Sequence, residues 1–225
     1  MEKLSNRQFR EIFDAAASQY DSVVSPYAGR RRIEFVVKRA RGRCLEVGAG
    51  TGEISHAISK NHEVTATDIS PKMVEEIQKK LKIPSLACDA EELPFPDASF
   101  DTVIGSEMIY YLDNPDRFLA EANRVLRKDG ALIITSASRA AYLYDRARAF
   151  LRFFGIGHTY FEDHMRHFPG AGYLRRLIGT AGFHIEETKR FIVVPFEGFD
   201  LLNRILEKTP LKYMAAFVGI GARKI

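Results

Sequence analysis

The chain has 225 residues, of which 46% are hydrophobic and 28% charged, and it contains no internal repeat or low-complexity segment. This length and composition predict one domain with a sizeable core. No apolar run approaches the roughly 20 residues that span a bilayer. The first residues lack the apolar segment of a secretory signal, so a cytoplasmic location is expected.

The net charge of +4 is mildly positive. This excess is too small for an obligate nucleic-acid binder, and no nucleic-acid partner is expected. The basic residues nevertheless crowd one short region, which contains Arg30, Arg31, Arg32, Lys38, Arg39, Arg41 and Arg43. The cluster is either a solvated helix face or a surface for anionic lipid, nucleotide or nucleic acid. We retain a peripheral contact with an anionic membrane as its candidate interaction.

The cysteines give no sign of metal or disulfide chemistry. Cys44 and Cys88 both fall in predicted buried strands, where they are expected to be small core residues. The spacing of cysteine and histidine residues matches no metal-binding pattern, so no metal is predicted.

Two helices are expected first, over residues 5–18 and 27–40, because apolar residues recur there at helical spacing. The apolar run 44–47 then predicts a strand, and glycines follow it at positions 48, 50 and 52 before a helix over 53–60. Gly48 and Gly50 permit a tight turn and a close approach to a ligand. Gly52 opens the helix, whose free N–H groups face the same place. This pattern predicts a cradle for the polar part of a small molecule.

The spacing of this turn distinguishes two kinds of cofactor. The dinucleotide fingerprint G-x-G-x-x-G requires a third glycine where Glu53 stands. Here the spacing is G-x-G-x-G, and Glu46 lies two residues before the first glycine. This combination resembles the first motif of class I S-adenosylmethionine-dependent methyltransferases.

An acid ends each of the next two predicted strands. The strand 62–68 ends at Asp68, twenty positions after Gly48, where an acid can accept hydrogen bonds from both ribose hydroxyls. The alternative is an N-cap or loop aspartate. Ser70 and Pro71 then begin a helix, and the strand 83–88 is followed by Asp89.

The text D-A-x-x-L-P-F-P-D-x-S-F-D from Asp89 to Asp101 closely resembles the ubiquinone and menaquinone methyltransferase group. The resemblance implies that Asp89 meets the adenine amine, which is a hydrogen-bond donor. The motif F-D-x-x-A-x-x-Y-D over 13–21 resembles the segment that folds over the cofactor, with Tyr20 at its methionine end. The implied cofactor-binding set is Tyr20, Glu46, Gly48, Ala49, Gly50, Gly52, Asp68, Ile69, Met73, Asp89, Ala90, Ser106 and Met108. Met73 is equally explained as a core residue.

The fourth strand, 100–105, leads into a loop that lacks the N-P-P-Y tetrapeptide, which disfavours nucleic-acid bases and protein glutamine as acceptors. Tyr110 and Tyr111 stand where related enzymes often carry histidine. A helix begins at Asn114, and its residues Glu121 and Arg124 match the family pattern E-x-x-R-V-L. The fifth strand is predicted over 131–135.

Residues 137–170 are predicted to form a cap over the acceptor, with an amphipathic helix over 142–154, although a plain surface helix-loop-helix is the alternative. A helix over 171–181, a strand over 183–194, a helix over 199–208 and a last strand over 213–222 follow. The resemblance implies an α/β, doubly wound, mostly parallel seven-stranded sheet of Rossmann-like type with an antiparallel last strand. We expect a single domain, 1–225, divided into N-terminal helices over the cofactor (1–42), a core (43–136), the cap (137–170) and the end of the sheet (171–225).

The expected reaction is in-line methyl transfer from S-adenosylmethionine to a small molecule, leaving S-adenosylhomocysteine. The acceptor is expected to be apolar or amphipathic, like a quinone, lipid or polyketide. The reasons are the aromatic residues of the cap, the apolar residues Phe191, Val193, Pro195 and Phe196, and the basic N-terminal helix. A base is needed only if the acceptor carries a proton at neutral pH. The candidates are Tyr20, Tyr110, Tyr111, His158, His164 and His167. An NAD-dependent oxidoreductase and a non-catalytic cofactor-binding relative remain the alternatives.

Overall fold

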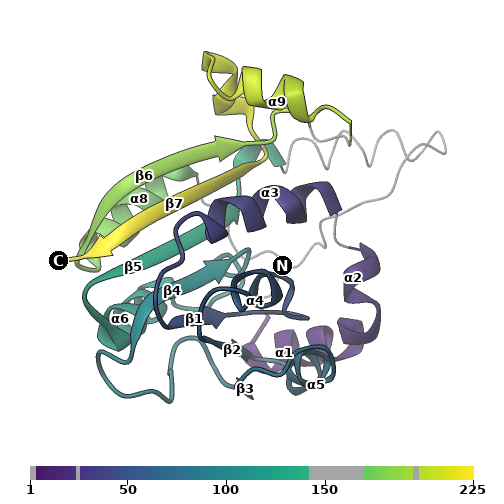
Figure 1. Cartoon of the computed structure of the whole chain (residues 1–225), viewed down its shortest axis with the longest axis vertical. Helices are drawn as coiled ribbons and strands as arrows, with labels where there is room; N and C mark the ends of the chain where they lie inside the picture. Colours follow the sequence, from purple (N-terminus) through teal and green to yellow (C-terminus); the bar gives the residue numbers. More distant parts are fainter. Residues whose placement is uncertain (1–3, 24–25, 142–169, 195–197) are drawn as a thin grey trace.

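The computed structural model describes residues 4–23, 26–141, 170–194 and 198–225. Its centre is a seven-stranded sheet with the strand order β3-β2-β1-β4-β5-β7-β6 (Figure 1). Strands β3, β2, β1, β4 and β5 pair in parallel, whereas β7 pairs antiparallel with both β5 and β6. The expected fold class is therefore confirmed. The strands are β1 (Cys44–Val47), β2 (Val64–Asp68), β3 (Ser85–Ala87), β4 (Phe100–Ser106), β5 (Leu126–Ala137), β6 (Phe183–Phe191) and β7 (Phe217–Lys224).

Helices cover both faces of the sheet. Helices α3 and α4 lie on one face and α6 and α8 on the other, while α1 packs against α5 beside the β3 edge (Figure 1). The helices are α1 (Asn6–Ala16), α2 (Tyr20–Val23), α3 (Pro26–Val37), α4 (Glu53–Ile58), α5 (Pro71–Lys80), α6 (Pro115–Val125), α8 (Ala171–Thr180) and α9 (Asp200–Leu206), with 3₁₀ helices η1 (Ala17–Gln19) and η2 (Pro210–Met214). No helix within the described ranges is long and apolar enough to cross a bilayer.

Side-chain caps fix where three of the helices begin. The Ser5 side chain accepts from the amide of Gln8 at the start of α1 and forms a reciprocal capping box with it. Ser70 caps α5 and Asn114 caps α6, and each is followed by a proline in the first turn, where a missing N–H costs nothing. Between these helices and the sheet, the largest fully buried side chains include Phe118, Leu45, Ile104 and Ile133.

The structure corrects several predicted boundaries. β5 begins at Leu126, earlier than predicted, because its first residue already pairs with Phe100 of β4. The last strand begins at Phe217 instead of residue 213, because Thr209 caps the 3₁₀ helix η2 in front of it. Cys88 lies just past β3 and is half-buried, so only Cys44 fits the prediction of a buried strand residue. Residues 142–169, which include most of the predicted cap, lie outside the described residues.

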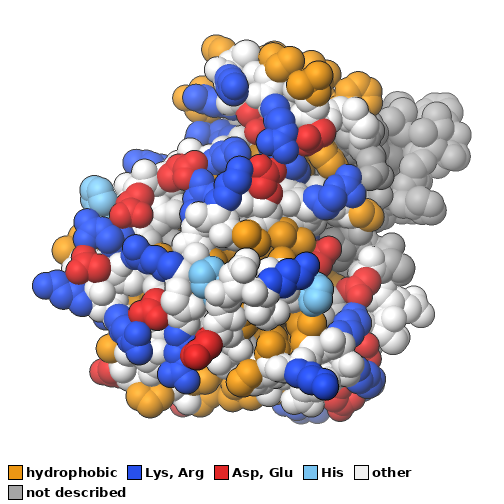
Figure 2. Space-filling model, viewed as in Figure 1, with side chains coloured by type: hydrophobic (Ala, Val, Ile, Leu, Met, Phe, Trp, Pro, Cys, Tyr) orange, Lys and Arg blue, Asp and Glu red, His pale blue; other side chains and the backbone are white. Residues whose placement is uncertain are grey.

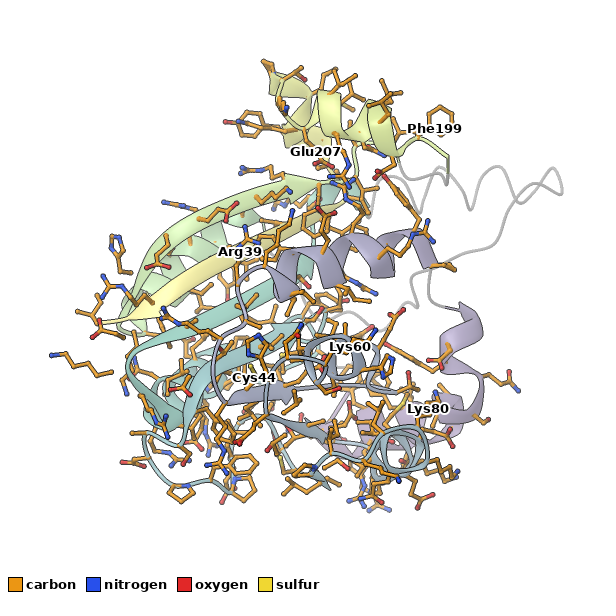
Figure 3. All side chains as sticks on the ribbon, in the orientation of Figure 1. Arg39, Cys44, Lys60, Lys80, Phe199 and Glu207 are labelled. Carbon is orange, nitrogen blue, oxygen red and sulfur yellow. The ribbon has the colours of Figure 1, made fainter. Side chains whose placement is uncertain are left out.

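The basic cluster near the N-terminus is not one solvated surface. Arg31 is only 5% exposed, and its guanidinium pairs with Asp200 at 3.1 Å and with Glu207 at 2.8 Å. These ion pairs join α3 to α9, and Figure 3 shows Glu207 pointing from α9 toward the body of the protein. Arg39 pairs with Glu187 of β6. The prediction of a common surface is thus wrong for Arg31, because the tertiary fold places two carboxylates around it.

Candidate functional site

The glycine turn has the tight geometry that its sequence predicts. Gly48, Gly50 and Gly52 all have positive φ angles, of 68°, 54° and 86°, which favour glycine over other residues. A Cβ atom at Gly48 would lie 2.8 Å from Cβ of Met108, and one at Gly50 would lie 3.3 Å from the Tyr20 ring. The turn therefore keeps open a space that any larger residue would fill.

Asp68 lies beside this turn at the end of β2. Its Oδ2 accepts from the amide of Gly50 at 2.8 Å, and its Oδ1 accepts from the amide of Ser70 at 2.9 Å. Burial raises the pKa of Asp68, and these two amides oppose the shift. Each carboxylate oxygen accepts one backbone hydrogen bond, so lone pairs remain for further donors.

Asp89 follows β3 and lies at the same end of the sheet. Its Oδ1 accepts from the amide of Glu91 at 2.9 Å, and its Oδ2 accepts from Asn6 Nδ2 at 2.8 Å. Helix α6 holds the loop that follows Asp89. There Arg124 donates to the carbonyls of Leu93 and Phe95, at 2.9 and 2.7 Å. The two sequence motifs that contain Asp89 and Arg124 are therefore parts of one structural unit.

The N-terminal segment is fastened across these strand ends by polar contacts at both its ends and its middle. Asn6 binds Asp89, Asp14 accepts from the Ser70 hydroxyl at 2.5 Å, and the Asp21 carboxylate accepts hydrogen bonds from Thr51 and Lys80. These partners come from the loops after β1, β2 and β3 and from α5. The F-D-x-x-A-x-x-Y-D motif thus supplies both acids, Asp14 and Asp21, that connect the segment to the core.

An aromatic group closes the same region from the loop after β4. The ring of Tyr111 packs edge-on against Phe9 and Phe13, with centroid distances of 5.4 and 5.3 Å. It also meets the Tyr110 ring at 4.6 Å. Such edge-to-face packing is favourable beyond simple area burial. The aromatic group therefore stabilises the N-terminal segment in its position over the glycine turn.

Two adjoining pockets surround the turn, and every predicted cofactor-binding residue lines one of them. The first holds about 720 Å³ of space, partly open to solvent, and the second about 1280 Å³. Tyr20, Gly48, Gly50 and Ser106 border both. The first pocket is also lined by Asp68, Ile69, Met73, Asp89, Ala90 and Met108, and the second by Glu46, Ala49 and Gly52. Their binding roles remain predictions.

Glu107 was absent from the sequence prediction although it borders both pockets. It has a positive φ of 56°, unusual for a residue other than glycine, at the turn after β4. The hydroxyls of Thr135 and Tyr110 donate to its two oxygens at 2.9 and 3.2 Å. Burial raises its pKa, while Arg32 opposes the shift. Its position at the end of a parallel strand, like that of Asp68, was the signal available in the sequence.

Glu46, inside β1, is another buried acid of the site. Its side chain accepts a hydrogen bond from the Ser55 hydroxyl of α4. Burial raises the pKa of Glu46 to about 7, and the hydrogen bonds from Ser55 only partly oppose this. Its carboxyl group therefore changes charge near neutral pH at the edge of the second pocket.

The predicted bases occupy different environments. Tyr20 and Tyr111 line the first pocket, whereas Tyr110 is buried behind it and donates to Glu107. His158, His164 and His167 lie outside the described residues, as do Pro195 and Phe196. Phe191 is a core residue stacked on Phe35 and Phe217, and Val193 is buried as well. These last two residues therefore give no support to an apolar acceptor site.

Fold and site together resemble those of S-adenosylmethionine-dependent methyltransferases. Residues 45–134 match the family model of the methyltransferase domain Methyltransf_11. The matched segment contains the glycine turn, Asp68, Asp89 and the loop after β4. One structural neighbour, from Thermotoga maritima, is described as an S-adenosylmethionine-dependent methyltransferase. It aligns with a TM-score of 0.69 and 25% identity, and the alignment includes 96% of this chain and 99% of the neighbour.

Curated relatives narrow the resemblance within this class. The chain is 34% identical over 151 residues to the ubiquinone/menaquinone biosynthesis C-methyltransferase UbiE of Bordetella parapertussis, and 33% identical over 144 residues to that of Burkholderia mallei. These matches cover 60% and 57% of this chain, and 58% and 59% of the relatives. The [4+2]-cyclase SpnF shares the fold, with a TM-score of 0.69 and 18% identity. That alignment includes all of this chain and 98% of the SpnF chain.

Proposed function

We propose that the protein transfers a methyl group from S-adenosylmethionine to a small-molecule acceptor. The observation that carries the proposal is the convergence of the glycine turn, Asp68 and Asp89 on one pocket, inside the segment that matches the methyltransferase domain. The bound cofactor supplies a methyl group that its sulfonium already activates. The protein then contributes chiefly by holding donor and acceptor in line.

The residues present fit this cofactor at each polar part. Asp68 has lone pairs left for the ribose hydroxyls, since each oxygen accepts one hydrogen bond from the backbone. Asp89 carries acceptor capacity for the adenine amine. The space at Gly48, which a Cβ would close against Met108, is suited to the methionine end of the molecule. Glu46, at the edge of the second pocket, offers a carboxyl group to the cofactor's ammonium group, whose positive charge would favour the ionised form of Glu46.

The walls of the first pocket favour an apolar or amphipathic acceptor, such as a quinone, lipid or polyketide-like compound. Phe9, Phe13, Tyr111, Met108 and Leu112 all line it. Pockets of this composition bind molecules that are mostly apolar, with a few polar groups fixing their orientation. The relatives named above, which are C-methyltransferases of ubiquinone and menaquinone biosynthesis, support a quinone-like acceptor.

Glu107 is our proposed proton acceptor from the methyl acceptor. It borders the pockets, and the donors Thr135 and Tyr110 fix its orientation. Burial raises the pKa of Glu107, which makes its carboxylate a stronger base. Tyr110 suits this role less well, because burial raises its pKa well above its ordinary value and its hydroxyl stays protonated.

Calorimetric titration with S-adenosylhomocysteine tests the cofactor. We expect binding by the intact protein and a loss of about 100-fold in Asp68→Ala and Asp89→Ala, because each variant removes a charged hydrogen-bond acceptor. Asp97→Ala is the control, since Asp97 is exposed and pairs only with Arg124 among the described residues. Binding of NADH in place of S-adenosylhomocysteine would contradict the proposal and favour an oxidoreductase.

Methyl transfer is then followed by mass spectrometry with a demethylated quinone and, in parallel, a polar amine. Transfer to the quinone is expected; transfer only to the amine would contradict the acceptor class, and cofactor binding without turnover on a wide acceptor panel would indicate a non-catalytic relative. Glu107→Gln is expected to keep the affinity for S-adenosylhomocysteine, lower turnover by about 100-fold and flatten its acid limb against pH. An unchanged pH profile would remove Glu107 from this role.

A further inference from the structure

Helix α9 presents its polar side to the protein and its apolar side to the solvent. Asn203 is fully buried and accepts hydrogen bonds from the amides of Val193 and Val194, while donating to the Tyr27 hydroxyl. One turn further on, Glu207 accepts from Arg31 and from the amide of Ile192. Polar contacts of this kind attach α9 to α3 and to the end of β6. This arrangement is the reverse of a helix that packs on a core.

The opposite side of α9 continues into an apolar ridge on η2. Leu201 is 75% exposed and Tyr213 is 68% exposed. Seven of the ten large exposed hydrophobic residues found in the described part of the chain fall within positions 199–214. Figure 2 shows apolar side chains gathered over this projection, and Figure 3 shows Phe199 pointing away from the body of the protein. The ridge consists of Phe199, Leu201, Leu202, Ile205, Leu211, Tyr213 and Met214.

A cationic hollow adjoins the ridge between β6, α9 and η2. It is lined by Thr188, Lys189, Arg190, Arg204, Glu207, Lys208 and Lys212. Its single carboxylate, Glu207, is already engaged by Arg31. Within the described ranges no ion pair forms at Lys189, Lys208 or Lys212, so their charge is uncompensated there.

Two contacts tie this charge to the ridge itself. The guanidinium of Arg190 lies 4.8 Å from the centre of the Tyr213 ring, and the ammonium of Lys212 lies 5.7 Å from it. An aromatic ring with a polar tip, flanked by cations and apolar side chains, is typical of residues at the boundary between lipid headgroups and acyl chains. A second hollow, lined by Arg30 and Leu201, continues the surface toward α3.

We propose that the α9–η2 ridge and the cationic hollow form a docking surface for an anionic lipid bilayer. The apolar side chains enter the interface, and the lysines of the hollow meet lipid phosphates. The charge favours lipid over a second copy of the chain, because a self-complementary contact would bring the lysines of the two hollows together. Arg30 of the predicted basic cluster borders this surface, and the proposal does not depend on the proposed reaction.

Vesicle sedimentation with the full chain tests the surface. We expect binding to phosphatidylcholine vesicles that contain phosphatidylglycerol, weaker binding to phosphatidylcholine alone, and a decrease with added salt. Leu201→Ser with Ile205→Ser, and separately Lys208→Glu with Lys212→Glu, are each expected to reduce binding by about tenfold or more. Matched controls elsewhere on the surface are Tyr173→Ser, and Lys60→Glu with Lys82→Glu, which should bind like the intact protein.

Retained S-adenosylhomocysteine binding and unchanged thermal unfolding establish that the ridge variants are folded, and they separate this test from that of the proposed reaction. No binding to either vesicle, or equal losses in the control variants, would overturn the proposal. Sedimentation velocity without lipid gives the remaining outcome. A dimer of the intact protein that the variant Leu201→Ser with Ile205→Ser dissociates would assign the ridge to a second copy instead and would also overturn it.

Discussion

The pocket at the ends of β1, β2 and β4 and the α9 projection handle polar groups in opposite ways. Around the pocket, Asp68, Asp89 and Glu107 are lining residues, and their carboxylates can accept further hydrogen bonds. Where α9 meets α3, by contrast, the polar side chains of Arg31 and Asn203 form their contacts inside the protein, and the leucines of α9 face outward. Polar groups oriented toward a cavity indicate ligand binding, whereas polar groups satisfied internally leave binding to the apolar side.

Breaking the internal network at α9 should have the largest effect. Arg31→Ala removes one partner of a buried ion pair and leaves Glu207 uncompensated, so we expect a loss of about 3–5 kcal/mol in the free energy of unfolding. The neighbouring Arg30→Ala, at an exposed position, should change it by less than about 0.5 kcal/mol. Urea denaturation measures both. Equal losses in the two variants would contradict the assignment of Arg31 as a buried connector.

The next effect concerns the buried acid beneath the pocket. The pKa of Glu46 is about 7 in the folded protein, above its ordinary value of 4.5. Between these pH values the unfolded chain has lost the proton while the folded chain keeps it, so stability falls as pH rises through this window. In the intact protein, this effect lowers the free energy of unfolding by about 2–3 kcal/mol between pH 4 and pH 8. Glu46→Gln should remove this decrease.

Denaturation at several pH values tests this prediction, with Glu63→Gln as the control. Glu63 is an exposed acid just before β2, and its replacement should leave the pH dependence of stability unchanged. If Glu46→Gln followed the same pH curve as the intact protein, the burial of Glu46 would not control this part of the curve. Asp68 and Glu107 act in the same direction, since burial raises the pKa of each.

The comparison is sharpened by two glycines with similar backbone angles. Gly48 has a φ of 68° and Gly198 a φ of 89°, but only Gly48 has a neighbour that a Cβ would touch. The positive φ alone should make alanine cost about 1–2 kcal/mol of stability at either position, and the contact with Met108 adds to this cost at Gly48. Only Gly48→Ala should also weaken S-adenosylhomocysteine binding, by about tenfold, because it closes the space beside Met108. An equal loss of affinity in Gly198→Ala would show that binding does not depend on the shape of the turn at Gly48.

The smallest effect is expected at the N-terminal segment. Asp14→Ala removes the hydrogen bond to Ser70 and should cost about 1 kcal/mol, which speeds amide exchange in α1 by roughly fivefold. Hydrogen exchange followed by mass spectrometry over residues 6–16 measures it. Glu11→Ala, which alters only an exposed pair with Arg7 on the same helix, is the control. Unchanged exchange in Asp14→Ala would mean that the other polar contacts and the aromatic contacts hold the segment without Asp14.

The family resemblance implied the seven-stranded sheet, whereas residue spacing alone predicted the single strands, the glycine turn and the acids after β2 and β3. These features depend on local spacing: a strand, a tight turn and a helix follow one another within a few residues, and parallel strands bring their ends to one edge. Glu107 also follows a strand, as Asp68 does. No family motif includes Glu107, however, so the sequence predicts only a loop residue there.

The burial of Arg31 and the orientation of α9 depend on tertiary contacts. Two carboxylate partners of Arg31, Asp200 and Glu207, lie 169 and 176 positions away in the chain, and no periodicity connects residues so distant. The sequence around α9 shows leucines and polar residues at helical spacing, which normally predicts that the leucines face the core. Glu207 and Asn203 reverse this orientation, because their hydrogen bonds to α3 and to the end of β6 require the polar side to face inward.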